Sequence, residues 1–505
     1  MSEISARWND KTRMIVRRIV VTGKLILLSP ARFGSGSETV VTDMPILRDA
    51  ASRKPLLPGS SIAGALRAYL RDRKLGYEKP ESAQGDSLPQ QLFGAVIDDV
   101  PENQRRSCAS YLVIEDSIAN AKSVEFRPGV KIDSKKRLVK MEKDESGEDE
   151  GGQLYDMELL EAGTVFELRF ELDLPEEESL QQELLTGFAT ALTGLELREI
   201  GLGARKRRGF GECKVIEWQV MDYNLKDPAH LKKWIISEPA TLSAGKTIAE
   251  KLGVKETLPD ARHLFKLEAE FQLATSLMIR SGGEDKESPD MVHLRSKRVD
   301  EKTWEQNKDT SPILSGTSLA GVLRARALRI ANTSMDEKLA KELVCEIFGP
   351  DELKTKAERK KDQSPDPFAS RLLVRERAVA GKDDLVQTRI RIDHFTGGTS
   401  PGALFEQQPV IGGDHSKILV SLELRKPKDE QIVLLLHILK DLWTGDLPIG
   451  GESSAGRGRL KGIHANLTLL RPEESKQEWH LTPGDGKQIV IEGDRQALAK
   501  FGGVK

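Results

Sequence analysis

A glycine-rich turn with basic side chains is the first candidate binding site in the sequence. The stretch GLGARKRRGFG, residues 201–211, places four consecutive basic residues among four glycines, between an expected helix and an expected strand. Glycine lets the backbone come close and point N–H groups at an anion, whose charge the basic side chains neutralise. The alternative is a tight surface turn whose charges are merely solvated. The candidate anion-binding residues are Gly203, Arg205, Lys206, Arg207, Arg208 and Gly209.

A second glycine-rich turn lies near the carboxyl end of the chain. The stretch IGGESSAGRGRLKGI, residues 449–463, also follows an expected helix, and it again places arginine beside glycine. Two copies favour anion binding over a solvated turn. Neither copy has the G-x-x-x-x-G-K-[ST] pattern that cradles nucleoside triphosphates, so that ligand class is disfavoured. The candidate residues here are Gly456, Arg457 and Arg459.

The two turns belong to an internal duplication. The phrase LPGSSIAGALR at residues 57–67 returns as LSGTSLAGVLR at residues 314–324, and further landmarks recur around it in the same order. A spacing of roughly 250 residues is typical of a duplicated domain, not of a solenoid repeat. A charged, apolar-poor segment at 351–367 is expected to be a mobile loop. We predict a first domain at 14–223, a linker at 224–263, a second domain at 264–470 and a C-terminal extension at 471–505.

Composition limits the class of protein. The 505 residues include 77 Lys and Arg against 79 Asp and Glu, a net charge of −2. Only the binding face must be positive, so a neutral total does not exclude a polyanionic ligand. The longest apolar runs are far shorter than the ~20 residues that span a bilayer, and the three cysteines are widely separated. We therefore expect no membrane association, no disulfide framework, no cysteine-based zinc site and a cytoplasmic location.

Expected helices and strands position the two turns. Ser60 or Ser61 can cap a helix whose apolar residues recur every four positions. Second helices are expected at 181–195 and 429–443, and each leads into a glycine-rich turn. Two helices among several strands in each repeat predict an α+β fold: two ferredoxin-like domains in tandem, each with helices on one face of its sheet and long irregular insertions.

The duplicated phrase and the glycine-rich turns resemble the RAMP superfamily of CRISPR-associated proteins. Each repeat is most similar to the backbone (Cas seven-family) subunits of type III effector complexes, over nearly its whole length. Two such units in one chain resemble the fused subunits of type III-D variants. The resemblance implies RRM-like palms with thumb-like insertions. It also implies subunits that stack along a guide crRNA beside other type III effector subunits and cut the paired target RNA at regular intervals.

The resemblance nominates an aspartate ahead of each duplicated phrase. In that group an Asp stands in a D-x-P-x-x-[RK]-D setting, which here is DMPILRD, beginning at Asp43. Asp43 lies seven residues after Gly36, and seven residues after Gly283 lies Asp290, which is also followed by Met and then by Arg. A lone carboxylate with a pKa of about 4 is a weak base at neutral pH. We expect it to hold a divalent ion, Mg²⁺ being the first choice, or to position the ribose for attack by the 2′-hydroxyl.

Alternatives to these aspartates stay open. In the second repeat Asp285 and Asp300 are further candidates, and His293 is close to Asp290 in sequence. A loop-capping role is the alternative for Asp43. Some members of the family have a His ahead of the glycine turn, where this chain has arginine. Arg32 and Arg280 are therefore candidates to stabilise phosphate charge.

The resemblance also implies RNA contacts at the start of each duplicated helix. Backbone N–H groups and hydroxyls at a helix N-terminus can hold phosphate, and arginine adds charge beside it. The alternative is a capped helix in which Gly64 and Gly321 serve close packing. The candidate RNA-binding residues are Ser60, Ser61 and Arg67 in the first repeat, and Thr317, Ser318 and Arg324 in the second.

These features predict a double backbone subunit of a type III CRISPR effector. It would bind guide crRNA and cleave complementary single-stranded target RNA by metal-assisted attack of the 2′-hydroxyl, with one Asp per domain. The first alternative is a non-catalytic guide-RNA scaffold, with cleavage carried by partner subunits. A crRNA-processing RAMP endoribonuclease is less favoured, because the sequence offers no plausible histidine base.

Overall fold

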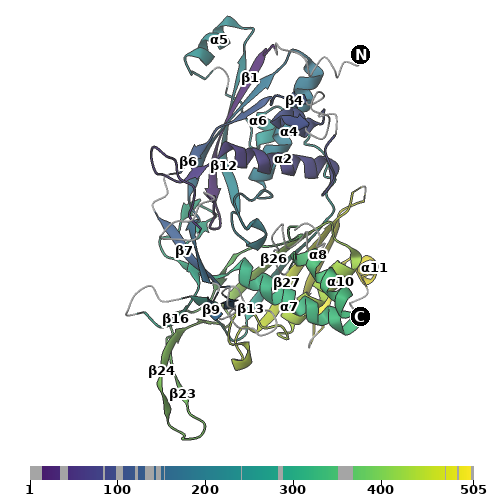
Figure 1. Ribbon diagram of the computed structural model, residues 1–505. Coiled ribbons are helices and arrows are strands. Elements are labelled where there is room, and N and C mark those ends of the chain that lie inside the picture. Colours follow the sequence, from purple (N-terminus) through teal and green to yellow (C-terminus); the bar gives the residue numbers. More distant parts are fainter. Residues whose placement is uncertain are drawn as a thin grey trace.

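The computed structural model comprises two domains that follow one another in sequence and lie one above the other in Figure 1. Each is a β-sheet covered by helices, which confirms the mixed α/β fold. Predictions on Gly36, Asp43, Gly283, Asp285 and the segment 351–367 fall outside the described residues. The described residues are 14–34, 44–82, 86–97, 106–119, 123–130, 141–143, 149–152, 154–239, 242–281, 288–350, 368–472, 474–485 and 488–501.

The first domain is built on a four-stranded antiparallel sheet. Every second side chain of Val165–Leu174 is buried, as a strand with one covered face requires. Phe170 on that face packs edge-on against Phe188 of a covering helix, with ring centroids 5.9 Å apart. In spatial order the strands are β12 (Cys213–Asn224), β1 (Arg17–Leu27), β11 (Val165–Leu174) and β5 (Leu112–Ile114).

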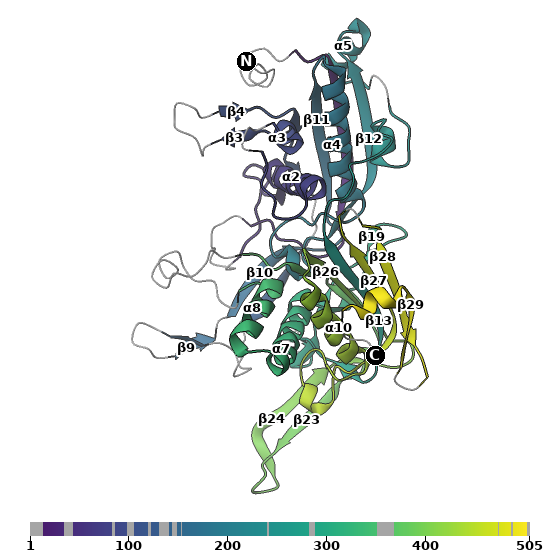
Figure 2. The ribbon, with the colours of Figure 1, turned by 90° about the vertical axis from the view of Figure 1, so that its right-hand side faces the viewer.

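Helices cover one face of this sheet, as Figure 2 shows for α2 and α3. The duplicated phrase opens α2, in which Ile62, Leu66 and Leu70 are buried, as a spacing of four predicts. The helices are α2 (Gly59–Leu75), α3 (Leu88–Phe93), α4 (Glu178–Glu196), α5 (Pro228–Ile235) and α6 (Ile248–Lys251). The shorter strands are β2 (Leu56–Leu57), β3 (Ala95–Ile97), β4 (Arg106–Cys108), β6 (Ser117–Ile118), β7 (Val124–Val130), β8 (Met141–Lys143), β9 (Asp149–Gly152) and β10 (Leu154–Leu160).

The second domain repeats this arrangement with a larger sheet. Four central strands have the same order as in the first domain: β27 (Leu460–Leu470), β13 (Leu264–Leu273), β26 (Lys417–Arg425) and β21 (Leu372–Val374). The same sheet continues through β17 (Arg295–Ser296), β20 (Ser311–Leu314) and β22 (Arg377–Ala380) at one end, and β28 (Gln477–Pro483) and β29 (Ile489–Gly493) at the other. The helices are α7 (Gly316–Ser334), α8 (Glu337–Phe348), α10 (Asp429–Trp443) and α11 (Arg495–Ala499).

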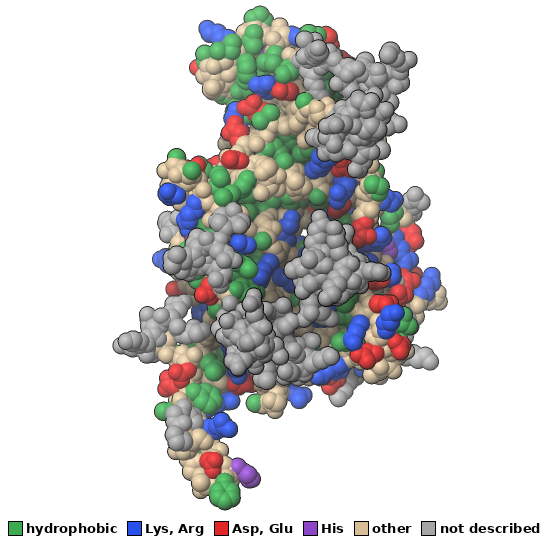
Figure 3. Space-filling model, in the orientation of Figure 1, with side chains coloured by type: hydrophobic (Ala, Val, Ile, Leu, Met, Phe, Trp, Pro, Cys, Tyr) green, Lys and Arg blue, Asp and Glu red, His purple; other side chains and the backbone are tan. Residues whose placement is uncertain are grey.

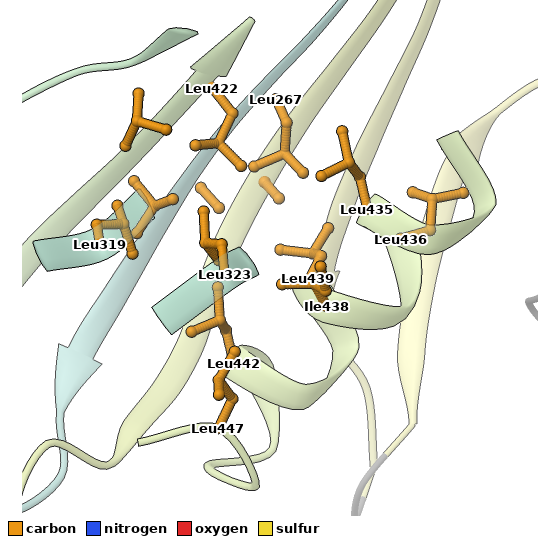
Figure 4. Close-up of a cluster of buried hydrophobic side chains, with 14 of the residues drawn as sticks. Leu267, Leu319, Leu323, Leu422, Leu435, Leu436, Ile438, Leu439, Leu442 and Leu447 are labelled. Atoms are coloured by element: carbon orange, nitrogen blue, oxygen red, sulfur yellow. The ribbon is translucent and has the colours of Figure 1, made fainter. Parts of the chain in front are cut away.

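The core of the second domain lies between its sheet and its helices. Figure 4 shows Leu267 and Leu422 of the sheet facing Leu323 of α7 and Leu439 of α10, and all four are buried. In Figure 2 the helices α7, α8 and α10 lie on one side of the strands. Within the described ranges, no helix combines the length and the apolar character needed to cross a membrane.

A long hairpin projects from the second domain, away from the body of the molecule (Figure 1). It consists of β23 (Gln387–Ile392) and β24 (Thr399–Gln408), and Phe395 near its tip is 98% exposed. It occupies the place of the predicted insertion. The remaining short strands are β14 (Ser276–Leu277), β15 (Arg280–Ser281), β16 (Met291–His293), β18 (Val299–Asp300), β19 (Glu305–Gln306) and β25 (Val410–Ile411).

The predicted linker and C-terminal extension both pack onto domains. Ile248 and Leu252, in and beside α6, belong to the apolar core of the first domain. In the extension, β28 pairs with β27, and Trp479 and Phe501 are buried in the second core. The extension therefore supplies two strands and a short helix.

The two domains are joined by ion pairs. Glu376, whose side chain is fully buried in the second domain, accepts from Arg127 of the first domain at 2.6 Å and from Arg298 at 2.7 Å. Burial alone would raise the pKa of Glu376, but the two guanidinium groups hold this pKa below its ordinary value. A second pair joins Glu212 of the first domain to Arg377, at 2.7 Å. The domains therefore meet at a defined, charged contact.

Candidate nucleic-acid interface

The first glycine-rich turn is held against the end of β1. Its centre is a one-turn 3₁₀ helix, Lys206–Arg208, between Arg205 and Gly209, which both have left-handed backbones. Ala204 donates its N–H to the Arg32 carbonyl at 2.9 Å, and a Cβ at Gly203 would lie 2.5 Å from that oxygen. Gly203 is therefore required by this close approach, which fixes the basic turn beside Arg32.

A cleft of about 770 Å³ runs between this turn, α2 and the second domain. Eight of its lining residues are basic and three are acidic. Figure 3 shows Lys and Arg side chains gathered around the hollow between the two domains. From the predicted set, the cleft is lined by Arg32, Ser60, Ser61, Gly203, Arg205, Lys206, Arg207 and Gly209. The sequence therefore identified one wall of a shared basic cleft.

The basic groups of the cleft are crowded and only partly neutralised. Arg207 makes no hydrogen bond or ion pair within the part of the chain that the structure describes, and burial, followed by the charge of Arg425, lowers its pKa to about 10. Burial and the charge of Arg205 likewise lower the pKa of Arg32. Arg205 is better satisfied, because it donates to the Tyr155 hydroxyl at 2.7 Å. An anion in the cleft would relieve these unfavourable interactions.

The start of α2 differs from the prediction. Pro58, and not Ser60 or Ser61, is the N-cap residue, and it has no side chain to bond the first turn. Ser60 and Ser61 are exposed and line the cleft. These two serines therefore line the cleft and do not cap the helix. In α7 the N-cap is Ser315, whose hydroxyl accepts from the N–H of Ser318 at 3.2 Å.

The mid-helix glycines of the duplicated phrase are not packing positions. A Cβ at Gly64 or at Gly321 would have no atom within 4 Å among the described residues. The close-packing alternative for these glycines is therefore wrong. A glycine inside a helix costs roughly 0.5–1 kcal/mol relative to alanine. Gly64 also lines the cleft, so an uncrowded helix surface faces the space that a ligand would occupy.

Arg67 and Arg324 are engaged away from the helix start. Arg67 pairs with Glu81 at 2.5 Å and donates to the Gly94 carbonyl at 2.9 Å. Arg324 makes the same kind of bond, to the Gly349 carbonyl at 2.8 Å. Both arginines therefore tie a helix to the loop that follows the next helix. These contacts favour a structural role over the predicted RNA contact.

Arg208 and Gly209 contact the second domain. Arg208 donates to the Phe348 carbonyl at 3.1 Å, and a Cβ at Gly209 would lie 2.5 Å from the Glu376 backbone N. The turn therefore has two sides. Arg205, Lys206 and Arg207 line the cleft, while Arg208 lies in the domain contact.

The second glycine-rich turn has the same backbone but different chemistry. Arg457 is only 3% exposed, and it donates to Gln407 at 3.0 Å and pairs with Glu452 at 3.2 Å. Arg280 also pairs with Glu452, at 3.2 Å. The prediction that Arg457 is a surface RNA ligand is not favoured by this burial. Arg280, Arg459 and Thr317 are exposed and Gly456 has no described atom within 4 Å of its Cβ position, so these residues remain accessible.

The segments that carry the two predicted cutting aspartates occupy equivalent positions. Met44, directly after Asp43, forms a parallel bridge with Met157, and Met291, directly after Asp290, forms a parallel bridge with Gln407. Asp43 itself lies outside the described residues. Asp290 is exposed, and its Oδ2 accepts from the N–H of Glu406 at 2.9 Å. Spacing alone had matched these two residues, and the strand pairing agrees with that match.

The other polar candidates near Asp290 have structural partners. His293 is 3% exposed, its Nδ1 accepts from the N–H of Ile279 at 3.2 Å, and its Nε2 donates to the Ile313 carbonyl at 2.9 Å. Burial lowers the pKa of His293, so it is a neutral structural histidine. Asp300 accepts from the N–H of Lys302 at 2.8 Å in a turn.

The described ranges contain no group of three or more His, Cys, Asp or Glu side chains that could hold a metal ion. A metal held by protein ligands alone therefore does not fit these residues. An ion shared between one carboxylate, water and RNA phosphates is compatible with an exposed Asp290, because Mg²⁺ usually keeps waters and binds only one or two carboxylates.

Comparison with known proteins identifies the family. The RAMP superfamily model matches the chain twice, at residues 24–214 and 270–461. The chain therefore belongs to the RAMP superfamily and carries two of its domains in tandem, as the internal duplication predicts. The second copy includes the long hairpin, and both copies include a glycine-rich turn.

Two curated relatives share the name CRISPR system Cms endoribonuclease Csm3. The protein from Mycobacterium tuberculosis is 29% identical over 216 residues, which cover 39% of this chain and 86% of that relative. The protein from Enterococcus italicus is 34% identical over 83 residues, which cover 15% of this chain and 38% of that relative. The present chain is thus similar to proteins named as endoribonucleases.

The sequence did not identify the wall that the second domain contributes. Arg375 and Arg425 line the cleft together with Tyr77, which follows α2. Tyr77 and Arg425 stand in no glycine-rich or repeated motif. They come together only because the end of β26 meets the first domain, so no local pattern indicates them.

Proposed function

We propose that this chain is a double backbone subunit of a type III CRISPR effector complex, most like the fused subunits of type III-D variants. It binds guide crRNA and cleaves complementary single-stranded RNA. The observation that carries the proposal is the basic cleft between α2 and the first glycine-rich turn, in a chain that belongs to the RAMP superfamily. A polyanion would neutralise the basic groups of that cleft. RNA is a polyanion whose phosphates repeat, so two similar domains can bind it in the same way.

The proposed fold of each domain is ferredoxin-like. The strand order β12-β1-β11-β5, with α2 between β1 and β5 and α4 between β11 and β12, supports it. The order β27-β13-β26-β21 supports the same proposal for the second domain. Sheets of this kind present one open face to RNA in other modules.

The proposed chemistry is attack of a ribose 2′-hydroxyl on the adjacent phosphate. Asp43 and Asp290 orient the ribose or share a Mg²⁺ ion with the RNA phosphates. His293 is buried and neutral, so it supplies no base at Asp290. In-line attack depends mainly on nucleotide geometry, which fits a site with one carboxylate. The requirement for a 2′-hydroxyl confines cleavage to RNA.

The projecting hairpin supports contact with paired RNA. Phe395 is almost fully exposed near its tip, and aromatic rings stack on bases. The base of the hairpin carries Glu406, whose N–H binds Asp290. A nucleotide displaced by the hairpin would therefore lie against the hairpin, whose strand β24 also binds Asp290, the proposed cutting residue.

The decisive experiment uses the chain assembled with its partner effector subunits and a matching guide RNA. End-labelled complementary RNA is added with Mg²⁺, and wild type is compared with Asp43→Asn and Asp290→Asn. We expect two cuts, each lost in one variant, while guide binding is unchanged. A DNA target of the same sequence, which has no 2′-hydroxyl, should remain intact.

The second candidate function is a guide-RNA scaffold without its own cleavage chemistry. The observation that favours it is the absence of a metal-binding cluster among the described side chains. If both cuts persist in the Asp43→Asn, Asp290→Asn double variant, cleavage belongs to partner subunits and the scaffold function replaces the first proposal.

A further inference from the structure

Tyr77 lines the cleft, and its buried hydroxyl is unpaired among the described residues. It follows α2, is 9% exposed, and its hydroxyl has no hydrogen-bond partner in the described structure. Burial raises the pKa of Tyr77, so the hydroxyl stays protonated and is a donor. A buried donor without an acceptor costs about 1–3 kcal/mol. An acceptor from outside the described residues would therefore stabilise this position.

Two guanidinium groups from different domains line the same cleft as Tyr77. Arg425, at the end of β26 in the second domain, stacks on the Tyr77 ring with its Cζ 5.1 Å from the centroid. Arg207, from the first glycine-rich turn, lines the same cleft and is affected by the charge of Arg425. Like charges brought together across a domain boundary repel each other unless an anion lies between them.

Glu423 and Asp72 offset part of the charge on Arg207 and Arg425. Glu423 is buried and accepts from Arg425 Nε at 3.3 Å, and the Nη atoms of Arg425 have no carboxylate partner among the described residues. Asp72 pairs with Arg71 at 2.9 Å. Arg207 makes no hydrogen bond or ion pair within the described ranges, so its guanidinium, like the Nη atoms of Arg425, is available to an anion in the cleft.

We propose that a phosphodiester group of RNA binds between the two domains, held by Tyr77 and Arg207 of the first domain and Arg425 of the second. The inference rests on the proposed RNA-binding function and adds to it a contact that neither domain makes alone. Arginine binds phosphate in a fork of parallel hydrogen bonds, and the tyrosine hydroxyl donates a third. A cleft of about 770 Å³ is within the range of ligand-binding clefts.

A shared phosphate has a consequence for the domain arrangement. An anion that contacts both domains binds best when they stand in one relative position, and it stabilises that position by mass action. Guide RNA would thereby select the spacing of the two domains. The ion pairs of Glu376 act at a separate contact and need no ligand.

The test compares RNA binding by the full-length chain and by variants of the cluster. The probe is a labelled single-stranded RNA of guide length, and Kd is measured over a range of salt concentrations. Arg425→Ala should weaken binding roughly ten-fold and reduce the salt slope by about 1, since one phosphate contact is lost. Tyr77→Phe should weaken binding a few-fold with no change in slope. Arg329→Ala, an exposed arginine of α7 outside the cleft, should bind like wild type.

A double-variant cycle identifies a shared phosphate. If Arg207 and Arg425 hold the same group, the effects of Arg207→Ala and Arg425→Ala will be less than additive. Additive effects would assign separate phosphates and overturn the inference. Inorganic phosphate at millimolar concentration is the second probe. If phosphate alone stabilises the chain against unfolding and Arg425→Ala leaves RNA binding unaffected, the site binds a free anion and not RNA.

The outcome separates this inference from the proposed function. If wild type binds RNA and Arg425→Ala and Tyr77→Phe bind it equally well, only the interdomain phosphate is excluded. If wild type does not bind RNA at all, the proposed function fails with it. Circular dichroism of each variant confirms that the fold is unchanged.

Discussion

Glu452 in the second domain occupies the backbone position that Arg205 has in the first. Both residues have left-handed backbones, with φ of 57° and 55°, and both precede a one-turn 3₁₀ helix. Arg205 donates to the Tyr155 hydroxyl, whereas Glu452 accepts from Gln407 at 2.6 Å. The duplication therefore preserved the backbone of the turn and reversed its charge.

The environments of the two predicted cutting segments differ in the same way. In the first domain, Met157 packs with Phe210 and Met44 in an apolar cluster. In the second domain, Gln407 takes the corresponding place and bonds Arg457 and Glu452. One segment is thus supported by apolar packing and the other by an ion network.

The ion network makes the second predicted cut sensitive to Glu452. Glu452→Gln should slow the cut that depends on Asp290 about ten-fold, because hydrogen bonds to a charged group contribute roughly 1.5–3 kcal/mol. The cut that depends on Asp43 should be unchanged, so the ratio of the two products in one reaction is the measurement. Glu430→Gln, on the exposed face of α10, is the control. Equal slowing of both cuts would contradict a local role for Glu452.

Gly209 and Gly456 provide a matched pair of substitutions. Both have left-handed backbones, with φ of 89° and 86°, so alanine at either costs about 1–2 kcal/mol. Only Gly209 also faces the backbone N of Glu376, at 2.5 Å from its Cβ position. Gly209→Ala should therefore lower the free energy of unfolding by about 1–3 kcal/mol more than Gly456→Ala. Urea denaturation measures the free energy of unfolding of both variants. Equal losses would show that the contact between the domains adjusts to the added methyl group at little cost.

The buried carboxylate of Glu376 should dominate the contact between the domains. Glu376→Gln removes the carboxylate that pairs with Arg298 and leaves Arg127 with Glu125 alone, and loss of one partner from a buried pair costs about 3–5 kcal/mol. The control is Glu301→Gln. Glu301 also forms a cross-domain pair, with Arg198, but it is 62% exposed, so its loss should cost less than about 1 kcal/mol. Denaturant unfolding of the two variants should show this difference, and similar values would refute the dominance of Glu376.

The free energy of unfolding should fall in acid because the Glu199 carboxylate becomes protonated. Burial alone would raise its pKa, but Arg262 and Lys266 lower it to about 2, against about 4.3 in an unfolded chain. A depressed folded-state pKa stabilises the protein above the unfolded value, and this contribution disappears as the pH falls from about 4.3 towards 2. The difference in Tm between wild type and Glu199→Gln should therefore be largest near neutral pH and shrink towards pH 2. A difference that does not vary with pH would exclude this linkage.

Local patterns predicted much of the architecture. The spacing of apolar residues identified α2, and the region 181–195 lies within α4, because both helices bury a regular stripe in their own domain. Counting from the glycine turns matched Asp290 with Asp43, and the bridges of Met44 and Met291 agree with it. These signals are local in sequence, so one chain is enough to detect them.

Roles that depend on distant partners could not be predicted. Arg67 has a side chain suited to binding phosphate. Its partners Glu81 and Gly94, however, are loop residues whose positions are set by tertiary packing. Arg457 has the same glycine setting as a surface ligand, yet the hairpin base buries it beside Gln407. Burial by another element decides the role of each arginine, and no motif records that burial.

The contact between the domains is head-to-tail, not two-fold. The turn that ends at Gly209 meets the start of α7, and the Arg208 carbonyl packs against Gly316. The corresponding places are the turn of the second domain and the start of α2 in the first. A Cβ at Gly456 would meet no described atom within 4 Å, and the three atoms nearest to a Cβ at Gly59 are carbonyl atoms of the first domain. A contact of this kind uses two different surfaces, so the second copy of each surface takes no part in it. If the proposed function holds and further subunits join through such contacts, the number of units would have to be set by the bound RNA or by a subunit that lacks one of the two surfaces.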